Sequence, residues 1–560
     1  MSVEGRHDAR LAQAQQEAGR TDITPSVARM LVGVFLTVIV AVPVSQILLE
    51  YDVLHSGLIS TVTTLTTTER PQTTATIGAL ILALNRRLLG TIHELTDRLD
   101  NDSLLAHYLR PNVQYLLTRW VGTGNEHVLI GRTGWLYYRQ DIEHVIGPGF
   151  LDPGQLAKRT ASGDSLNDPP TPDPRPALNQ FHTALARRGI SLILLPTPVK
   201  PTIHPEHLEL ETTQTPIQNV SFSRFITEMR NDGLMVFDPA PLLVSLRNRG
   251  EPTYLATDTH WRPNAVVAVA GALAAFIDRE VPLHREKPFF TERRMTPVTN
   301  QGDTVALLNL TNEPLPDMSE TVILPQVITS DGQSWRVDTR SDVLLMGDSF
   351  ANIYSLPSMG WGDGAGLAEQ VSAALGRRLD RTVQNDNGAF ATREALAREI
   401  QRGRDPLVGK RLVIYQFTTR ELTHGDWRLV DFAPQPATIA QTVLTPIVGQ
   451  RLTVRGRIRQ RAPAPRPSSV PYRDHIIAID LDEIISTGAQ IDETEALVYL
   501  SSMEDNIWTE AATLDIGQTV TLTLRPWSEV TAERGGVTRS ELVDGNVLYA
   551  EPWWGELTTP

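Results

Sequence analysis

Apolar and polar residues follow three different patterns along the chain, and the first is a long uncharged run near the N-terminus. Residues 30–49 carry no charged side chain, and a run of about 20 such residues is long enough for a helix to cross a bilayer. Arg29 precedes the run, and Glu50 and Asp52 follow it. The positive-inside bias therefore predicts a single-pass anchor, with residues 1–29 as a cytoplasmic tail and the bulk of the chain outside. A cleaved signal peptide and a buried soluble helix are the two alternatives. Against the signal peptide, the preceding segment is long and contains acidic residues, and no small-residue cleavage site follows.

Residues 50–125 are predicted to form a mostly helical stalk. A threonine-rich piece broken by Pro71 gives way to an apolar segment at residues 77–84. This segment is too short for a second membrane span. Its apolar face is therefore expected to pack against the next domain or against a partner.

The second pattern, over residues 126–437, alternates short apolar strands with helical segments. Runs that contain β-branched residues predict buried strands, and longer apolar segments such as residues 265–277 predict helices between them. Alternating strands and helices are typical of a parallel sheet with helices on its faces. We therefore predict an α/β fold for this region, with active groups at the carboxyl ends of the strands. The expected strands include residues 190–195, 234–238, 343–346, 382–383 and 412–417.

The third pattern, over residues 438–560, is a series of short strands without helices between them. Such a series predicts a small all-β barrel or sandwich. The region contains four tryptophans, which suit either a core with its rim or a face that stacks on sugars. These are Trp508, Trp527, Trp553 and Trp554.

A serine stands where the buried strand at residues 343–346 gives way to a predicted helix. Gly347 and Asp348 lead directly into Ser349. A serine on such a turn presents its hydroxyl above the sheet, and the adjoining helix N-terminus offers N–H groups to a developing oxyanion. The arrangement is that of a nucleophile elbow, although the G-x-S-x-G pattern is absent. On its own, however, a glycine-containing turn between a strand and a helix is common.

A pair of residues upstream of Ser349 strengthens the hypothesis that this serine is catalytic. Asp258 and His260 are two positions apart, so in an extended segment their side chains project to the same side. Acyl transfer needs a base to take the serine proton and a carboxylate to orient the imidazole. Each residue also has a structural interpretation, His260 as a core histidine and Asp258 as a cap for the helix after Pro263.

Two further residues are candidates for binding a substrate. Lys200 follows the strand at residues 190–195 and could contact an anionic glycan, with a surface ion pair as the simpler alternative. Trp135 could stack on a sugar, although alternation along a strand favours a place in the core. No metal site is predicted, since His204 and His207 stand among prolines without a third ligand in a recognised spacing.

Composition mainly excludes classes of function. An apolar fraction of 41% is enough for real cores and argues against wholesale disorder. The net charge of −14, without a block of lysine or arginine, argues against a nucleic-acid partner. The chain has no cysteine, so it has no disulfide, thiolate nucleophile or cysteine-ligated metal.

Several motifs, in the same order, resemble those of the periplasmic alginate O-acetylation proteins, which carry an SGNH-hydrolase-like domain. The resemblance covers roughly residues 128–427 and implies that Ser349, His260 and Asp258 form a catalytic triad. Ordinary SGNH esterases place Asp-x-x-His after the serine, whereas Asp-x-His precedes it here, as in the acetylation proteins. The motifs are GRTGWLYY from Gly131, TDTHW from Thr257, GDSFANIY from Gly347 and KRLVIYQFTTREL from Lys410.

The resemblance also implies a reaction and its partners. The family transfers acetyl groups through an acetyl-serine to hydroxyls of an exopolysaccharide outside the inner membrane, without a cofactor, and a membrane-bound O-acyltransferase supplies the acetyl groups. SGNH enzymes use asparagine and glycine as oxyanion donors, which implies Asn387 or Gly388 here, with a plain turn as the alternative. Two other hypotheses stay open: an acetyl esterase with the same triad, and a catalytically silent, anchored glycan-binding protein. Arg420 and Glu421 are expected to form a structural ion pair.

Overall fold

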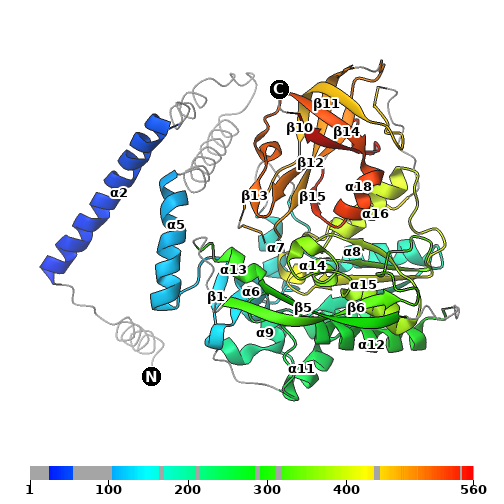
Figure 1. The fold of residues 1–560 in the computed structure, drawn as a ribbon. Coiled ribbons are helices and arrows are strands. Elements are labelled where there is room, and N and C mark those ends of the chain that lie inside the picture. The colour runs from blue at the N-terminus through cyan, green and yellow to red at the C-terminus, as the bar shows by residue number, and fades with distance from the viewer. Residues whose placement is uncertain are drawn as a thin grey trace, which may run out of the picture. The chain divides into compact units, whose positions relative to one another are not determined.

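The computed structural model divides the chain into two units, Met1–Val113 and Gln114–Pro560, which are described separately (Figure 1). The described residues are 24–53, 104–162, 169–208, 214–283, 291–310, 318–433, 442–467, 469–470, 472–487, 490–542 and 545–558.

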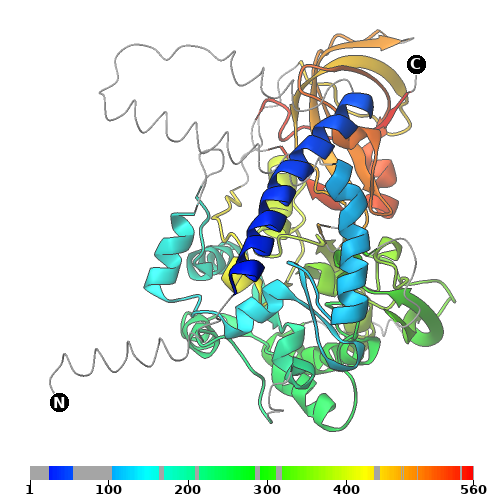
Figure 2. The ribbon, with the colours of Figure 1, turned by 90° about the vertical axis from the view of Figure 1, so that its left-hand side faces the viewer.

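The described part of the N-terminal unit contains the long helix α2 (Pro25–Val53), drawn in dark blue in Figure 2. A second helix, α5 (Leu104–Leu116), continues into the π-helical turn η1 (Leu117–Val121) across the boundary between the units. Among the residues that the structure describes, no helix combines the length and apolar character needed to cross a membrane. The helix predicted over residues 30–49 is present as part of α2, but its role as a membrane anchor is not confirmed. Most of the predicted tail, and the stalk over residues 54–103, lie outside the described residues.

A five-stranded parallel sheet forms the centre of the second unit, with strand order β4-β3-β9-β7-β8. All residues of β7 and β9 are buried, as expected of strands that helices cover on both faces. The strands predicted from the sequence are present and parallel, which confirms the α/β fold. The strands are β3 (Ser191–Thr197), β4 (Met235–Val236), β7 (Val343–Gly347), β8 (Asp380–Val383) and β9 (Leu412–Thr418).

Each face of this sheet has its own hydrophobic core, because successive side chains of a strand point to opposite faces. Val343 and Leu345 of β7 pack with α11, α12 and α15. Leu344 and Met346 pack with α8, α10 and α16 on the other face. The helices are α6 (Arg139–Ile146), α7 (Pro153–Thr160), α8 (Pro174–Ala186), α9 (Lys200–Ile203), η3 (Pro205–Leu208), α10 (Phe222–Asn231), α11 (Ala240–Asn248), α12 (Pro263–Glu280), α13 (Asp303–Leu307), α14 (Ser349–Asn352), η5 (Pro357–Met359), α15 (Leu367–Leu375), α16 (Ala391–Gln401) and α17 (Glu421–His424).

Two antiparallel pairs of strands lie outside the central sheet. A hairpin forms from β1 (Val128–Ile130) and β2 (Leu136–Tyr138), joined through the 3-10 turn η2 (Arg132–Gly134). A long ribbon, β5 (Thr291–Gln301) with β6 (Ser319–Thr329), was not predicted. Most described side chains of β5 are polar and at least partly exposed, so the strand carries little of the apolar pattern on which such a prediction depends.

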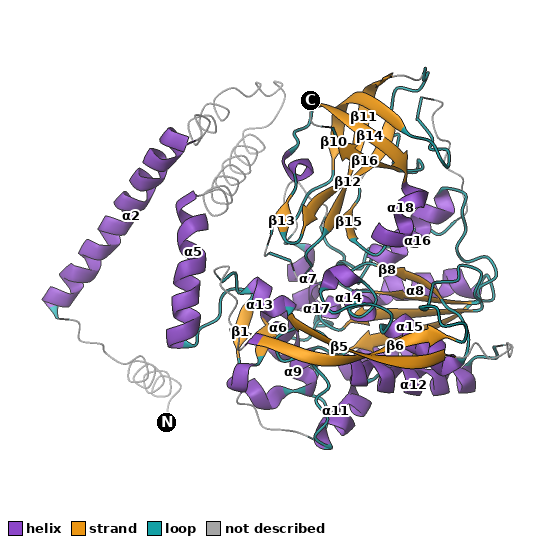
Figure 3. Ribbon diagram, viewed as in Figure 1, coloured by secondary structure: helices purple, strands orange, loops and turns teal. Residues whose placement is uncertain are grey.

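The C-terminal region is all-β apart from short helical segments, as predicted (Figure 3). Its seven strands have the order β13-β12-β16-β14-β10-β11-β15, and an additional pairing of β12 with β11 closes the sheet on itself. The sequence predicted either a barrel or a sandwich, and this closure makes the region a barrel. The elements are β10 (Leu452–Arg461), β11 (His475–Thr487), β12 (Ala496–Glu504), β13 (Ile507–Trp508), η6 (Glu510–Thr513), β14 (Thr519–Pro526), α18 (Trp527–Arg534), β15 (Thr538–Ser540) and β16 (Trp553–Leu557).

The tryptophans of the barrel belong mainly to its core. Trp553 and Trp554 are buried, and Trp527 packs against the same cluster. Only Trp508 among the four is exposed, at 38% of its surface. The boundary predicted between residues 437 and 438 lies outside the described residues, so it stays a prediction.

Candidate active site

The strand-to-helix turn predicted at Ser349 is present in the structure. β7 ends at Gly347, and α14 begins at Ser349, with Asp348 as its N-cap. A side chain at Gly347 would have its Cβ 2.7 Å from the Oε1 atom of Gln416 and from the Cβ of Ala351. Glycine is therefore required for the turn to approach β9 and its own helix so closely.

Asp348 fixes this turn to the neighbouring strand. Its Oδ1 accepts hydrogen bonds from the backbone N–H of Phe350 at 2.9 Å and from Nε2 of Gln416 at 2.8 Å. Its Oδ2 accepts from the backbone N–H and the hydroxyl of Thr418, at 2.7 and 2.6 Å. Four donors thus satisfy a carboxylate that is only 4% exposed, and they hold the residue before Ser349 in one position.

Asp258 and His260 form a tight pair in a bend rather than on an extended strand. The bend lies between Tyr254 and Trp261, which form an isolated β-bridge. Oδ1 of Asp258 accepts a hydrogen bond from the backbone N–H of His260 at 3.0 Å and lies 2.6 Å from Nδ1 of its ring. The predicted pairing is therefore present, although a turn rather than strand alternation produces it.

The other oxygen of Asp258 is held by residues that the sequence reasoning did not assign to the site. Its Oδ2 accepts from Nε1 of Trp361 at 2.8 Å and from the backbone N–H of Asp303 at 3.1 Å. Gly302 packs against the Asp258 loop so closely that a Cβ there would lie 2.1 Å from the Thr257 carbonyl oxygen. The structure thus fixes the Asp258 carboxylate from both sides.

Asp303 places a second carboxylate beside the imidazole. It accepts from the backbone N–H and hydroxyl of Thr259 at 2.7 and 2.5 Å, and its Oδ2 lies 3.5 Å from Nδ1 of His260. Burial, followed by the charge of Asp258, raises the pKa of Asp303 to about 6. No periodicity in the sequence marks Asp303 as a neighbour of His260.

The pair of Asp258 and His260 has the electrostatics of a base and its orienting carboxylate. Burial tends to raise the pKa of Asp258, but the charge of His260 and hydrogen bonds from His260 and Trp361 outweigh it and lower this pKa to about 2. Burial tends to lower the pKa of His260, but the charge and hydrogen bond of Asp258 and the charge of Asp303 raise it above its usual value. An ionised carboxylate in this position stabilises the imidazolium that forms when the base takes a proton.

The structure brings His260 to the segment that carries Ser349. The imidazole lies 4.7 Å from the ring of Phe350, measured between centroids. Trp261 Nε1 also donates to the Phe350 carbonyl at 3.0 Å, and the hydroxyl of Tyr354 donates to the Trp261 carbonyl at 2.7 Å. Within the described part of the chain, the hydroxyl of Ser349 and Nε2 of His260 are both buried without a hydrogen-bond partner. The two loops meet, but a direct serine–histidine hydrogen bond is not present.

The oxyanion candidates lie on the loop after β8, next to the serine turn. A Cβ at Gly388 would lie 3.0 Å from Oδ2 of Asp348, so this glycine backs the turn directly. Asn387 is exposed, with a left-handed φ of 55°. Asn385 is the buried asparagine of this loop, and its Oδ1 accepts from Nδ2 of Asn352 at 2.8 Å. The role of Asn387 or Gly388 as an oxyanion donor stays a prediction.

Lys200 is buried, whereas Trp135 is only partly buried, and its role in stacking on a sugar stays a prediction. The ammonium of Lys200 is buried and donates to the carbonyls of Leu136 at 2.6 Å and Ala256 at 3.2 Å. Burial lowers its pKa to about 8. The surface ion pair expected for Lys200 is therefore wrong, because the residue links β2 to the loop that leads to Asp258. Trp135 packs against the core, with one face stacked on His207 at 4.1 Å between ring centroids.

The expected pair of Arg420 with Glu421 is also wrong. Arg420 instead donates to Asp141 at 2.9 Å, and Asp141 is fully buried. Glu421 accepts from the backbone N–H of Ala389 at 3.0 Å, and burial raises its pKa to about 7. Consecutive residues at the start of a helix do not face each other, so they are poorly placed to pair. The guanidinium of Arg420 lies 5.9 Å from the ring centroid of Phe350, beside the candidate site.

A cleft of about 530 Å³ separates the loop after β8 from part of the barrel. Gln384 and Asn387 line it from the α/β side, and Arg539 and Tyr549 line it from the barrel. The barrel also contacts α14, because Nδ2 of Asn352 donates to the Gly536 carbonyl at 3.3 Å. One wall of the cleft is thus the loop that also carries Gly388, the glycine packed against Asp348.

Comparison with known proteins identifies the family. The family model described as an SGNH hydrolase-like domain of the acetyltransferase AlgX matches residues 128–418, more than half of the chain. The chain belongs to this family. The matched range begins at β1 and ends at β9, so it contains Asp258, His260 and Ser349 and leaves the barrel outside.

Curated relatives and solved structures of this family are similar to parts of the chain. The probable alginate O-acetylase AlgJ of Pseudomonas aeruginosa is 29% identical over 189 residues, 33% of this chain and 42% of that protein. The corresponding protein of Pseudomonas fluorescens is 24% identical over 226 residues, covering 40% and 51% respectively. The chain thus spans about half the length of these relatives. The O-acetyltransferase domain of Pseudomonas putida AlgJ has a TM-score of 0.40 and 17% identity, over 53% of this chain and 93% of that domain.

Proposed function

We propose that the chain is a polysaccharide O-acetyltransferase in which Ser349 carries the acetyl group. The observation that carries the proposal is that Ser349 Oγ and His260 Nε2 are both buried without a hydrogen-bond partner, on two segments that meet at Phe350. A nucleophile and its base need this proximity, with the base oriented by a third group. Asp258 supplies that orientation at 2.6 Å from Nδ1.

The reaction has two half-reactions that use the same three residues. In the first, His260 Nε2 takes the hydroxyl proton of Ser349 while Ser349 Oγ bonds to the acetyl carbon of a donor ester. The imidazolium then protonates the donor oxygen as it leaves. In the second, His260 takes the proton of a sugar hydroxyl as that oxygen attacks the acetyl-serine. The C–O bond to Ser349 breaks, and the imidazolium returns the proton to the serine oxygen.

Burial of the serine favours transfer over hydrolysis as the outcome. Ser349 is 2% exposed and His260 is 1% exposed. A site that excludes water protects an acyl-enzyme until a sugar hydroxyl enters. We propose the neighbouring cleft of about 530 Å³ as the approach for the polysaccharide, because Asn387 from the loop beside Asp348 lines it.

A small activated ester and a set of oligosaccharides test this function with the full chain. We expect oligosaccharide products that carry new acetyl groups, and we expect their formation to be lost in Ser349→Ala and in His260→Ala. The matched control is Ser223→Ala, because Ser223 is an exposed serine on α10. Release of acetate without acetylated sugar would instead indicate an esterase, and activity that survives Ser349→Ala would overturn the proposal.

We further propose that the chain acts outside the cytoplasm, with residues 30–49 as its membrane anchor and a membrane-bound O-acyltransferase as its acetyl source. The uncharged run between Arg29 and Glu50 supports this location. Protease added to intact spheroplasts is expected to degrade the α/β domain. Complete protection, with degradation only after lysis, would contradict it.

A further inference from the structure

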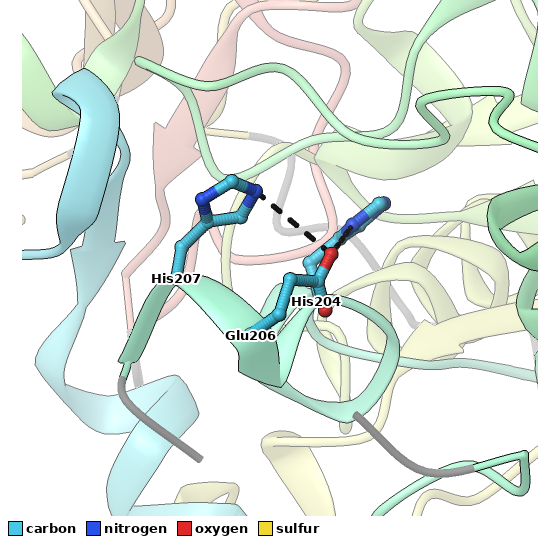
Figure 4. Close-up of side chains that lie close together, drawn as sticks. All are labelled: His204, Glu206 and His207. Atoms are coloured by element: carbon cyan, nitrogen blue, oxygen red, sulfur yellow. Dashed lines mark hydrogen bonds and ion pairs between the residues drawn. The ribbon is translucent and has the colours of Figure 1, made fainter. Parts of the chain in front are cut away.

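Three side chains that follow β3 lie close together and are not part of the candidate active site. The short helices α9 and η3 place His204, Glu206 and His207 together (Figure 4). One ligand atom from each residue lies within 4.8 Å of the others. Oε1 of Glu206 lies 2.8 Å from Nδ1 of His204 and 3.8 Å from Nε2 of His207. The carboxylate thus lies between one nitrogen of each imidazole.

The second nitrogen of each imidazole contacts a threonine hydroxyl outside the cluster. Nε2 of His204 lies 2.9 Å from Oγ1 of Thr253, and Nδ1 of His207 lies 3.2 Å from Oγ1 of Thr133. A histidine that binds a metal commonly donates its other N–H to an oxygen acceptor, which fixes the tautomer and the orientation of the ring. Each imidazole thus has a threonine hydroxyl on its side away from the carboxylate, and Nε2 of His204 also accepts from the backbone N–H of Thr253 at 3.4 Å.

The surrounding structure holds the rings in place. Trp135 stacks on His207 with an interplanar angle of 10° and lies 4.8 Å from His204 between centroids. Gly131 packs against the segment so closely that a Cβ would lie 2.7 Å from the His207 carbonyl oxygen. The side chain of His204 is 4% exposed, whereas those of Glu206 and His207 are 27% and 23% exposed. The cluster therefore has a fixed inner side and an open outer side.

We propose that His204, Glu206 and His207 bind a divalent transition-metal ion of the zinc class. The ligands are Nδ1 of His204, the carboxylate of Glu206 and Nε2 of His207. Two imidazoles and one carboxylate are an established donor set for zinc, with solvent completing the coordination. Oε2 of Glu206 is buried without a hydrogen-bond partner and lies 4.0 Å from Nη1 of Arg247. Oε2 thus faces the guanidinium of Arg247, and Oε1, which lies between the two imidazoles, is the oxygen placed to bind the ion.

The bound ion links three segments that support the candidate active site. Thr133 belongs to the turn of the β1–β2 hairpin, and Thr253 precedes the bend that contains Asp258. The backbone N–H of Leu136 in β2 also donates to the Ala256 carbonyl at 2.8 Å. The ion therefore stabilises the hairpin and the Asp258 loop together and has no part in the chemistry at Ser349.

Calorimetric titration of the full chain with Zn²⁺, after removal of metal with a chelator, tests the site. We expect one zinc ion per chain and a higher melting temperature on zinc addition. Glu206→Gln and His207→Gln are expected to weaken zinc binding by more than about tenfold, and Thr133→Val, which removes no ligand, by about 10–100-fold. The matched control is His127→Gln, because His127 lies beside Glu126 without a third ligand.

The readout is independent of enzymatic activity, so it separates this proposal from the proposed function. Circular dichroism and melting of the zinc-free variants show whether each is folded. Absence of stoichiometric zinc binding by the unmodified chain would overturn the site. Binding that Glu206→Gln and His207→Gln leave unchanged, with both variants folded, would overturn it equally.

Discussion

Replacement of Asp348 by asparagine tests whether its carboxylate holds the serine turn. The substitution preserves the shape of the side chain but turns one oxygen into an NH₂ group. If this group replaces Oδ2, it faces the backbone N–H and the hydroxyl of Thr418, which now donate at 2.7 and 2.6 Å. The hydroxyl can rotate to accept instead, but the N–H cannot. In the opposite orientation the amide leaves both the N–H of Phe350 and Nε2 of Gln416 without their acceptor.

Either orientation of the amide therefore leaves at least one buried N–H group without an acceptor. An unsatisfied buried donor costs about 1–3 kcal/mol, so Asp348→Asn is expected to lower the free energy of unfolding by that amount. Asp348→Ala removes the acceptor for all four donors and is expected to cost more. Because Ser349 follows directly, we also expect kcat for acetyl-ester turnover to fall more than KM changes.

Urea unfolding of the full chain and steady-state turnover of an activated acetyl ester measure the two effects. Asp278→Asn is the control, since Asp278 is exposed on α12, and surface changes of this kind usually stay within about 0.5 kcal/mol. The reasoning is refuted if Asp348→Asn is as stable as the control and retains full kcat.

Three further substitutions test the setting of the imidazole. Trp361→Phe keeps an aromatic ring but removes the N–H that donates to Asp258. A hydrogen bond to a charged group is worth about 1.5–3 kcal/mol. We therefore expect kcat to fall about 10–100-fold in a folded protein. Asp303→Asn removes a charge that raises the pKa of His260, so this pKa is expected to fall. Because the neutral imidazole is the base, the acid limb of the pH–rate profile is then expected to move to lower pH. Gly302→Ala is expected to displace the Asp258 loop and reduce both stability and turnover, because its Cβ has no room beside the Thr257 carbonyl.

Each of these substitutions has a control or an outcome that contradicts it. Gly271→Ala is the control for the glycine, since Gly271 lies in α12 with nothing within 4 Å of a new Cβ, and alanine should stabilise that helix slightly. An unchanged kcat in Trp361→Phe would show that the indole does not hold the carboxylate. A pH–rate profile of Asp303→Asn that moves to higher pH would show that the sign of the interaction is wrong.

The sequence predicts the α/β core well because its signals are local. The apolar run at residues 343–346 marks a buried strand, and Gly347 directly after it marks the turn to Ser349. The spacing of Asp258 and His260 likewise predicts a pair that the structure contains. Strand order and the closure of the barrel depend on pairings between distant segments, and no single segment encodes them.

The parts of the site that the sequence did not reveal depend on long-range contacts. Trp361 reaches Asp258 across 103 positions in the chain. Lysine is rarely buried, and the burial of Lys200 depends on two carbonyl acceptors far away in the sequence, one in β2 and one in the loop before Asp258. Glu206 stands between two histidines in the sequence, but its bridging position depends on how η3 folds.

The central claim is that Ser349 becomes acetylated with His260 as its base. The most direct test is to mix the full chain with an activated acetyl ester, quench the reaction, and map the modified peptides by mass spectrometry. The account predicts one acetyl group on Ser349, absent from Ser349→Ala and formed more slowly in His260→Ala. Acetylation of another residue at the same rate in all three proteins, with Ser349 unmodified, would contradict it.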